Sequence, residues 1–476
     1  MKGRDSQLVP LFWGVLLALT LLRLGLAATL GVSPDEAYYW TWSRHLQTGY
    51  LDHPPMIALW IRLGTALFGD SAFGIRLLGP LSALLGSIML VRAGRDLLGS
   101  ERAGYRASLL LNATLMLGLG AATATPDTPL VFFLTLTLWA LGRMIASGQP
   151  RWWLATGFFF GLAFDSKYTA VLPALACGLW VLATPPQRRH WLWLCGGAVI
   201  GLTTISPVLF WNATHHWASF IKQGGRAGDW HPLKAVSYLA ELAGGQIGLA
   251  TPLVFLLFCV GILWCLRRAG REPVARLLAC LCVVPIAVFV QHAFGGRVQA
   301  NWPVVIYPAA ALAAAATQRR IGYACTLGLT ITALISIQGM VAPIHLSAHH
   351  DVIARQTADW SGLARRVQGE VSPDHSLVVG DYALAAIMRY ETPDQPVYSY
   401  DTRWGFLGDY RGSARDDPGA RAQLLIRESE KPDLPAAWLG PTETKRFCRL
   451  LRGQPIICYR LINLNLPAGT EMFRLP

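Results

Sequence analysis

Carboxylates stand beside apolar runs at two points of the chain, where they could take part in proton transfer. Asp35 and Glu36 follow the first apolar run in "SPDEAYYWTWSRHL", and Asp127 stands between two prolines in "TATPDTPLVFF". A carboxylate held in such a place can accept a proton from a hydroxyl group that attacks an electrophile. The same patterns are typical of helix starts, since Ser33 can cap, Pro34 suits the first helical position and Glu36 completes a capping box. The sequence therefore leaves two roles possible for these acids, base catalysis and helix capping.

Side chains that could bind an anionic group occur in four further segments, "GYLDHPP", "GLAFDSKYTAVLPAL", "WNATHHWASFIKQGGRAGDWHPLK" and "HAFGGRVQANWP". The candidate phosphate ligands are Lys167, His53, Arg226 and Arg297, and the further candidate substrate contacts are Tyr38 and Asn301. Lys167 near an outward surface would suit an anionic phosphate, because a cation stabilises negative charge on the phosphate oxygens. The alternatives are structural. Asp165 and Lys167 could only mark a hairpin turn, and the Arg and Trp residues could only anchor the chain at a membrane surface.

The elements that must position these residues are membrane helices. Of the 476 residues, 53% are hydrophobic and 14% are charged, and the mean hydropathy is +0.37. Apolar runs of about 17 to 25 residues, each long enough to cross a bilayer, recur from residue 8 to residue 344. The first run is longer than a signal-peptide core and contains Arg23, and further spans follow it, so we expect a retained helix. The chain is therefore predicted to be a polytopic membrane protein.

We expect eleven spans, of which the fifth and sixth are short. They lie near residues 8–30, 72–91, 107–124, 129–146, 152–165, 169–184, 191–211, 247–266, 277–294, 303–317 and 321–343. Arginine clusters fall in every second connection, the pattern of cytoplasmic loops. The loops near residues 31–70, 125–128, 212–246 and 295–302, and everything after residue 344, are then expected outside. Losing either short span would reverse the side of the tail.

The net charge of +13 does not indicate a nucleic-acid partner. Residues 345–476 hold 16 Lys/Arg and 16 Asp/Glu, while the membrane part holds the other 25 basic and 12 acidic residues. The excess therefore lies in the loops that set topology. Seven cysteines lie in apolar spans, where they act as small hydrophobic residues. No Cys/His spacing resembles a zinc site.

The chain is expected to divide at residue 344, into a membrane domain 1–344 and a periplasmic α/β domain 345–476. In the tail, "RQTADWSGLARRVQ" and "YALAAIMRY" have helical spacing, whereas "SLVVGD", "PVYSYD", "AQLLIRE" and "PIICYRLINL" are typical of strands. Cys448 and Cys458 flank "RLLRGQPII", where Gly453 could turn one strand back on another. A disulfide between them is plausible in an oxidising compartment.

Six segments in order resemble the bacterial branch of the dolichyl-phosphate-mannose protein mannosyltransferase superfamily. They are "SPDEAYYWTWSRHL", "GYLDHPPMIALW", "TATPDTPLVFF", "GLAFDSKYTAVL", "GGQIGLATPL" and "QANWP". This branch is similar to glycosyltransferase family 39 and includes the aminoarabinose and galacturonic acid transferases of lipid A. The resemblance implies a GT-C membrane fold. It places the first-loop acid pair on Asp35 and Glu36, the second-loop acid on Asp127 and the lysine of the Ser-Lys segment on Lys167.

The resemblance implies transfer of a sugar from a polyprenyl phosphate to a lipid A, lipopolysaccharide or other envelope glycan acceptor outside the inner membrane. It implies no metal or other cofactor, and we expect a monomer without a nucleic-acid partner. A protein mannosyltransferase is an alternative within the enzyme class. A lipid-linked sugar flippase is the alternative from another class, but a transporter typically carries repeated halves and charges near the midplane. Here no repeat is visible and the unusual charges gather at the outer loops.

Overall fold

The structure, a computed structural model, describes residues 8–184, 189–224, 230–348, 350–371, 375–407, 415–416, 421–438, 445–467 and 470–475. The chain divides into two compact units. The first, called the helical unit, comprises Met1–Gly25, Asp52–Ile57 and Arg76–Ser336. The second, called the mixed unit, comprises Leu26–Leu51, Ala58–Ile75 and Ile337–Pro476. Each unit is therefore assembled from separate pieces of the sequence.

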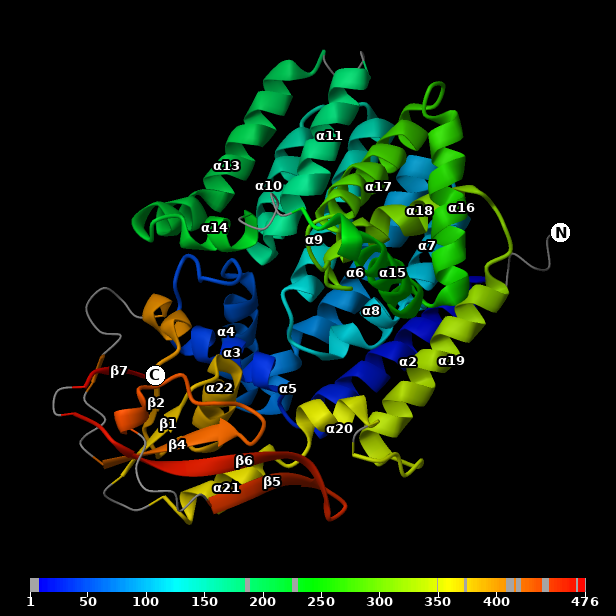
Figure 1. Ribbon diagram of the computed structural model, residues 1–476. Helices are drawn as coiled ribbons and strands as arrows, with labels where there is room; N and C mark the ends of the chain where they lie inside the picture. The colour runs from blue at the N-terminus through cyan, green and yellow to red at the C-terminus, as the bar shows by residue number, and fades with distance from the viewer. Residues whose placement is uncertain are drawn as a thin grey trace. The chain divides into compact units, whose positions relative to one another are not determined.

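The helical unit consists of helices joined by turns and short 3-10 segments, as Figure 1 shows. Its elements are α2 (Leu8–Thr29, running into the mixed unit), α6 (Leu78–Leu98), α7 (Glu101–Asn112), α8 (Leu115–Gly118), η1 (Gly120–Ala122), α9 (Asp127–Ser147), α10 (Trp152–Ser166), η2 (Tyr168–Ala170), α11 (Val171–Ala183), α13 (Trp191–Thr214), α14 (Ala218–Gly224), α15 (Pro232–Ala250), α16 (Pro252–Arg268), α17 (Pro273–His292), η3 (Trp302–Ile306), α18 (Tyr307–Ala316) and α19 (Gly322–Val341, running into the mixed unit). The alanine-rich α18 is almost wholly buried and contacts α7, α16 and α17. Small side chains allow this close packing of helices.

Six helices among the described residues are long and apolar enough to cross a membrane. They are Leu8–Thr29, Ala72–Leu98, Asp127–Ser147, Trp191–Thr214, Pro273–His292 and Gly322–Val341, each overlapping a predicted span. The pair α15 and α16, bent by 108°, adds a seventh if it crosses as one broken span. The other predicted spans fall on shorter helices, so the count of eleven stays a prediction. The protein is a multi-pass membrane protein.

Two of the predicted outward loops contain helices in the structure. Residues 31–70 contain α3 (Pro34–Arg44) and α4 (Met56–Phe68). Residues 212–246 were expected to form an outward loop, but they contain α14 and most of the 19-residue helix α15. Pro232 occupies the first turn of α15 and starts it without losing a helical hydrogen bond. The apolar residues of "AVSYLAELAGGQIGLA" then continue at helical spacing. The histidines and tryptophans of this segment drew the sequence interpretation toward a loop.

The mixed unit combines first-loop helices with a sheet from the end of the chain. Its helices are α3 (Pro34–Arg44), most of α4 (Met56–Phe68), α5 (Ala72–Arg76), α20 (Val352–Thr357), α21 (Trp360–Gln368) and α22 (Tyr382–Glu391), with η4 (Thr402–Phe406) and η5 (Ala436–Trp438). The strands are β1 (Ser376–Val379), β2 (Val397–Ser399), β3 (Arg415–Asp416), β4 (Arg421–Arg427), β5 (Lys445–Leu451), β6 (Gln454–Asn465) and β7 (Met472–Arg474). The α/β character predicted for the tail is confirmed.

The sheet has the order β3-β7-β2-β1-β4-β6-β5, and among the described strands the pairs of β1 with β2 and of β1 with β4 are the parallel ones. The helix α22 connects β1 to β2 and packs on both strands. On one face, Val378, Leu424, Ile462 and other buried side chains form an apolar core. The predicted helix over residues 355–368 is interrupted, because Asp359 adopts a φ of 60° between α20 and α21.

The β5–β6 hairpin carries the predicted disulfide. Cys448 and Cys458 face each other in the register and are bonded. The strands turn through Arg452 and Gly453, with φ values of 50° and 78°, as in the two-residue turns that suit the twist of a hairpin. The turn predicted at Gly453 and the disulfide are therefore confirmed.

The helix α3 belongs to the same compact unit as the tail, from which about 300 residues of sequence separate it. Tyr38 makes edge contacts with the rings of Tyr382 and Trp404, at centroid distances of 4.8 and 5.3 Å. Trp40 packs edge-on against Tyr390 at 5.1 Å. By packing, residues 26–51 and 58–75 thus group with residues 337–476. The domain boundary at residue 344 stays a prediction.

Candidate active site

Asp127, Lys167 and Asn301 meet in the interior of the helical unit. The carboxylate of Asp127 accepts hydrogen bonds from Lys167 Nζ on one oxygen and from Asn301 Nδ2 on the other, each at 2.7 Å. The Lys167 and Asp127 side chains are only 6% and 4% exposed. These residues come from the start of α9, the break between α10 and η2, and the segment before η3. Three sequence candidates therefore form one buried network.

The network favours a chemical role for Asp127 over a role as a helix cap. Asp127 lies in the first turn of α9, but the helix has Pro126 at its N-cap and no side-chain cap hydrogen bond. Both carboxylate oxygens instead bind side chains from distant segments. Lys167 does stand at a turn between helices, as the structural alternative proposed, yet its ammonium is buried and paired. The acidic partner of Lys167 was not anticipated from the sequence.

The "DHPP" segment, residues 52–55, contributes a second ion pair to the helical unit. Asp52 forms an ion pair with Lys222 Nζ of α14 at 2.5 Å, and its backbone carbonyl accepts from Gln223 Nε2 at 2.8 Å. Burial, followed by the positive charge of Lys167, lowers the pKa of His53 to about 4, although Asp52 and Asp127 act in the opposite direction. His53 is therefore a neutral imidazole at pH 7. It can exchange hydrogen bonds with a ligand but adds no positive charge.

The loop that carries Asn301 is supported by the "GGQIG" segment of α15. Gln246 Nε2 donates to the carbonyl of Ala300 at 2.7 Å, and Gln246 Oε1 accepts from the Tyr307 hydroxyl at 2.9 Å. A Cβ atom on Gly245 would lie 2.8 Å from Ala300 Cβ, so the close approach of this loop needs a glycine. Gln246 therefore acts one step away from Asp127, by fixing the backbone beside Asn301. The only indication of this role in the sequence was that Gln246 lies in "GGQIGLATPL", one of the segments that carry the family resemblance.

Several buried polar atoms beside this network lack a hydrogen-bond partner among the described residues. They include Thr125 Oγ1, Asp165 Oδ1 and Thr169 Oγ1. Thr125 stands two residues before Asp127, and Asp165 and Thr169 flank Lys167 by two residues each. A buried polar group without a partner costs roughly 1 to 3 kcal/mol, so such atoms call for water or ligand hydroxyl groups. The surroundings of Asp127 and Lys167 thus suit a ligand rich in hydroxyl groups.

The two acids of the first loop, Asp35 and Glu36, lie in the mixed unit and differ in their exposure and hydrogen bonding. Ser33 Oγ accepts from the backbone N–H of Glu36, and Glu36 Oε2 accepts from the backbone N–H of Ser33 at 3.0 Å, which completes the predicted capping box. Glu36 is 1% exposed, whereas Asp35 is exposed at the start of α3. Glu36 therefore serves the helix cap, and Asp35 presents its carboxylate at the surface of its unit. Tyr38, a predicted substrate contact, is buried among aromatic rings of the tail.

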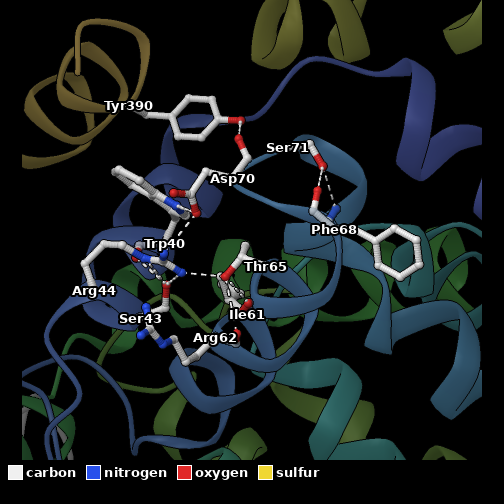
Figure 2. Close-up of polar contacts among 11 residues, drawn as sticks. Trp40, Ser43, Arg44, Ile61, Arg62, Thr65, Phe68, Asp70, Ser71 and Tyr390 are labelled. Atoms are coloured by element: carbon white, nitrogen blue, oxygen red, sulfur yellow. Dashed lines mark hydrogen bonds and ion pairs between the residues drawn. The ribbon is translucent and has the colours of Figure 1, made fainter. Parts of the chain in front are cut away.

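A polar network fixes α3 in the mixed unit, as Figure 2 shows. Asp70 accepts from Trp40 Nε1 at 2.9 Å and forms an ion pair with Arg44 at 3.0 Å, and its carbonyl accepts from the Tyr390 hydroxyl at 3.1 Å. Arg44 also donates to Thr65 Oγ1 of α4 at 2.5 Å. These contacts join α3, the segment after α4 and α22. They hold the helix that carries Asp35 in one orientation within its unit.

Of the two remaining predicted cations, Arg297 does not belong to either group. Arg297 forms an ion pair with Glu241 at 2.6 Å and is 74% exposed. Arg226 lies outside the described residues. Within the described ranges, no three His, Cys, Asp or Glu side chains gather in a way that could hold a metal ion. The Asp52–Lys222 pair and the Asp70 network are further polar features that no spacing in the sequence indicated.

Residues 52–211 match the protein family described as dolichyl-phosphate-mannose-protein mannosyltransferase. The chain is 27% identical to the lipid A galacturonosyltransferase RgtD of Rhizobium johnstonii over 285 residues, which cover 59% of each protein. It is 28% identical to undecaprenyl phosphate-alpha-4-amino-4-deoxy-L-arabinose arabinosyl transferase 1 of Pseudomonas fluorescens, over 58% of this chain and 54% of that protein. The chain thus spans less than two thirds of the length of these curated relatives.

Among solved structures, the chain resembles ArnT from Cupriavidus metallidurans over nearly the whole of both proteins. With the structure bound to undecaprenyl phosphate, the TM-score is 0.62 at 17% identity, covering 97% of this chain and 98% of that one. With the apo structure, the TM-score is 0.63 at 18% identity, over the same shares. The family match and the curated relatives confirm the resemblance to the mannosyltransferase superfamily drawn from the sequence. The ArnT structures show that the chain has the same GT-C fold.

Proposed function

We propose that this protein is a membrane glycosyltransferase. It takes a sugar from a polyprenyl-phosphate donor and passes it to lipid A, lipopolysaccharide or another envelope glycan at the periplasmic face of the inner membrane. The buried network of Asp127, Lys167 and Asn301 carries the proposal. The matched relatives modify lipid A or use undecaprenyl phosphate by name, and an ArnT structure contains undecaprenyl phosphate, which supports the same donor class here.

The chemistry of the reaction accounts for a buried pair of opposite charges. The acceptor oxygen forms a bond to the anomeric carbon, the bond from that carbon to the phosphate oxygen breaks, and the acceptor loses a proton. A lysine ammonium has three N–H donors, and the ion pair with Asp127 uses one of them. Lys167 can therefore bind a phosphate oxygen while it stays paired. This fixed charge stabilises the leaving phosphate without reorganisation during the reaction.

The remaining residues take supporting roles in this proposal. Asp127 orients Lys167 and Asn301, and His53 contributes hydrogen bonds as a neutral imidazole. The unpartnered oxygens of Thr125 and Asp165 suit sugar hydroxyl groups. Asp35 is proposed as the acid that accepts the proton or orients the acceptor, because it is exposed at the start of α3. A single displacement inverts the configuration at the anomeric carbon.

We further propose eleven spans, with the N-terminus inside and the tail in the periplasm, from the positive-inside pattern. We propose that the enzyme acts as a monomer without a metal. A protein mannosyltransferase remains the alternative within the class, and residues 52–211 match a family of that description. A flippase is disfavoured, since the buried polar residues of the site lie at helix ends and turns rather than in the middle of spans.

The test has two parts. Mass spectrometry of envelope lipids and glycans, with and without the gene, identifies the sugar that is lost. Purified protein is then given that sugar on undecaprenyl phosphate together with the unmodified acceptor in detergent, with and without EDTA. Transfer in both conditions supports the proposal. An unchanged envelope, and no release of sugar from donors of several classes in detergent, would exclude a transferase.

A further inference from the structure

A fully buried arginine lies in the part of α2 that belongs to the helical unit. Arg23 is 0% exposed, inside a helix that is long and apolar enough to cross a membrane. Its partners among the described residues are neutral. Nε donates to the carbonyl of Gly118 at 3.2 Å and Nη2 donates to Asn112 Oδ1 at 2.9 Å, while Nη1 has no hydrogen-bond partner there. An arginine at such a place is costly and is typically functional.

The two acceptors of this arginine belong to the connection between α7 and α9. Asn112 is the last residue of α7, and Gly118 is the last residue of the short helix α8. The chain then passes through η1 and reaches Asp127, the first residue of α9, nine positions after Gly118. The planar guanidinium therefore holds the connection at two points, just before α8 and at its end.

Asn112 extends the hydrogen bonding of Arg23 to α6. Its Nδ2 donates to Ser87 Oγ at 2.8 Å and to the carbonyl of Ser108, one turn earlier in α7, at 2.9 Å. The Asn112 amide thus uses both of its donors and its acceptor, and all four of these residues are buried. Buried side-chain networks of this kind rigidify a core and favour one arrangement. The start of the connection is therefore fixed relative to α2 and α6.

The rest of the connection can transmit this position to Asp127. It packs so closely on α6 that a Cβ atom on Gly79 would lie 2.3 Å from the carbonyl oxygen of Ala121 in η1. The backbone N–H groups of Thr123 and Thr128 each donate to the carbonyl three residues earlier, which closes one turn after η1 and another at the start of α9. A short connection made of closed turns leaves Asp127 little freedom once its far end is held.

We propose that Arg23 is a positioning residue for sugar transfer, which fixes the place of Asp127 by holding Asn112 and Gly118. The inference rests on the proposed function, in which Asp127 orients the buried ammonium of Lys167 at 2.7 Å. A misplacement of about 1 Å at a reacting centre, caused by a change far from it, can cost about 100-fold in rate. Loss of the Arg23 contacts should therefore reduce the rate of transfer while the donor still binds.

The central variant is Arg23→Met, which keeps a long unbranched side chain but removes the charge and both hydrogen bonds. Binding of undecaprenyl phosphate to the purified full chain in detergent counts the intact sites, and the rate of transfer is divided by that number. We expect the rate per site to fall about 10- to 100-fold. If Arg23 only supported folding, the variant would have fewer sites, and each would work at the wild-type rate.

Arg23→Lys keeps the test decisive if the methionine variant does not fold. A lysine retains the charge and can donate to one acceptor, but it lacks the planar fork that reaches two. Its rate per site should lie between those of Arg23→Met and the wild type.

The matched control is Trp180→Phe. It removes another buried hydrogen bond of the helical unit, from Trp180 Nε1 to the carbonyl of Pro273 at 2.8 Å, between α11 and α17. Its rate per site should equal that of the wild type. A wild-type rate per site in either Arg23 variant, or an equal loss in the control, would overturn this inference alone. Absence of transfer by the wild type would overturn the proposed function, and the inference with it.

Discussion

Replacing Asp127 with asparagine separates the structural and chemical roles of the buried network. The change keeps the size of the side chain but removes its charge, and the new amide directs N–H groups at one of its two partners. With Lys167 only 6% exposed, its ammonium would be left without its acidic partner in a poorly solvated place. Removing one partner of a buried ion pair costs about 3 to 5 kcal/mol, so the variant should unfold at a clearly lower temperature.

The matched variant is Asp127→Asn combined with Lys167→Met, which removes both charges. Replacing a buried pair by neutral side chains of similar volume is often neutral for stability, so the double variant should recover most of the unfolding temperature. It should not recover transfer, because the phosphate would have lost its cation. The two single variants and the double variant form a cycle that isolates the coupling of the pair.

The assays are thermal unfolding in detergent and transfer of labelled sugar from undecaprenyl phosphate. We expect low stability and low activity in the single variant, and restored stability with low activity in the double variant. If the Asp127→Asn variant transferred sugar at the wild-type rate, the carboxylate would have only a structural role. Unchanged stability in every variant would show that the ion pair at 2.7 Å does not contribute as its burial indicates.

Three further results are expected. Asp35→Asn should reduce transfer to a hydroxyl acceptor about 100-fold or more with at most about 1 kcal/mol lost in stability, and near-normal turnover would leave the first-loop acids as a helix start only. The unfolding temperature should fall as the pH is lowered from about 7 to about 4, because His53 takes up a proton near pH 6.5 in the unfolded chain but only near pH 4 in the folded protein. His53→Gln should reduce this pH dependence, and an identical pH profile in the variant would contradict the prediction. Replacing both Cys448 and Cys458 with serine should destabilise the tail by roughly 2 to 3 kcal/mol. The measurement is the rate at which a protease cleaves within residues 345–476 of the full chain, and equal protection in the variant would argue against a stabilising disulfide.

The sequence predicted local features well because their causes are local. The capping box of α3 depends on Ser33 and Glu36, three positions apart, and the turn at Gly453 depends on one glycine between strand-like segments. The pairing of Asp127 with Lys167 and Asn301 was not predictable in the same way. It joins residues 40 and 174 positions apart, and no periodicity encodes that meeting. Residue type and place in the sequence selected these residues, and the family resemblance supported Asp127 and Lys167, but only the packing of helices identified their partners.

The span count shows a different limit. Hydropathy identifies long apolar helices such as α2 and α13, but α10 and α11 are 15 and 13 residues long. Such lengths are below the roughly 20 residues that usually cross a bilayer, and composition alone cannot distinguish a short span from a buried helix. The role of α3 was missed for a related reason. Its aromatic residues fit a membrane interface equally well, whereas they pack on Tyr382 and Trp404 of the tail.

The discontinuity of the mixed unit has a consequence for biosynthesis. The aromatic face of α3 leaves the ribosome early, but its partners on α22 follow about 340 to 350 residues later. At a synthesis rate of about 5 to 20 residues per second, this delay is roughly 17 to 70 seconds. During that interval Tyr38 and Trp40 lack their native cover, and the first loop is open to chaperones and proteases. A ribosome that stalls before residue 382 would therefore release a chain whose membrane helices can insert but whose first loop stays incomplete.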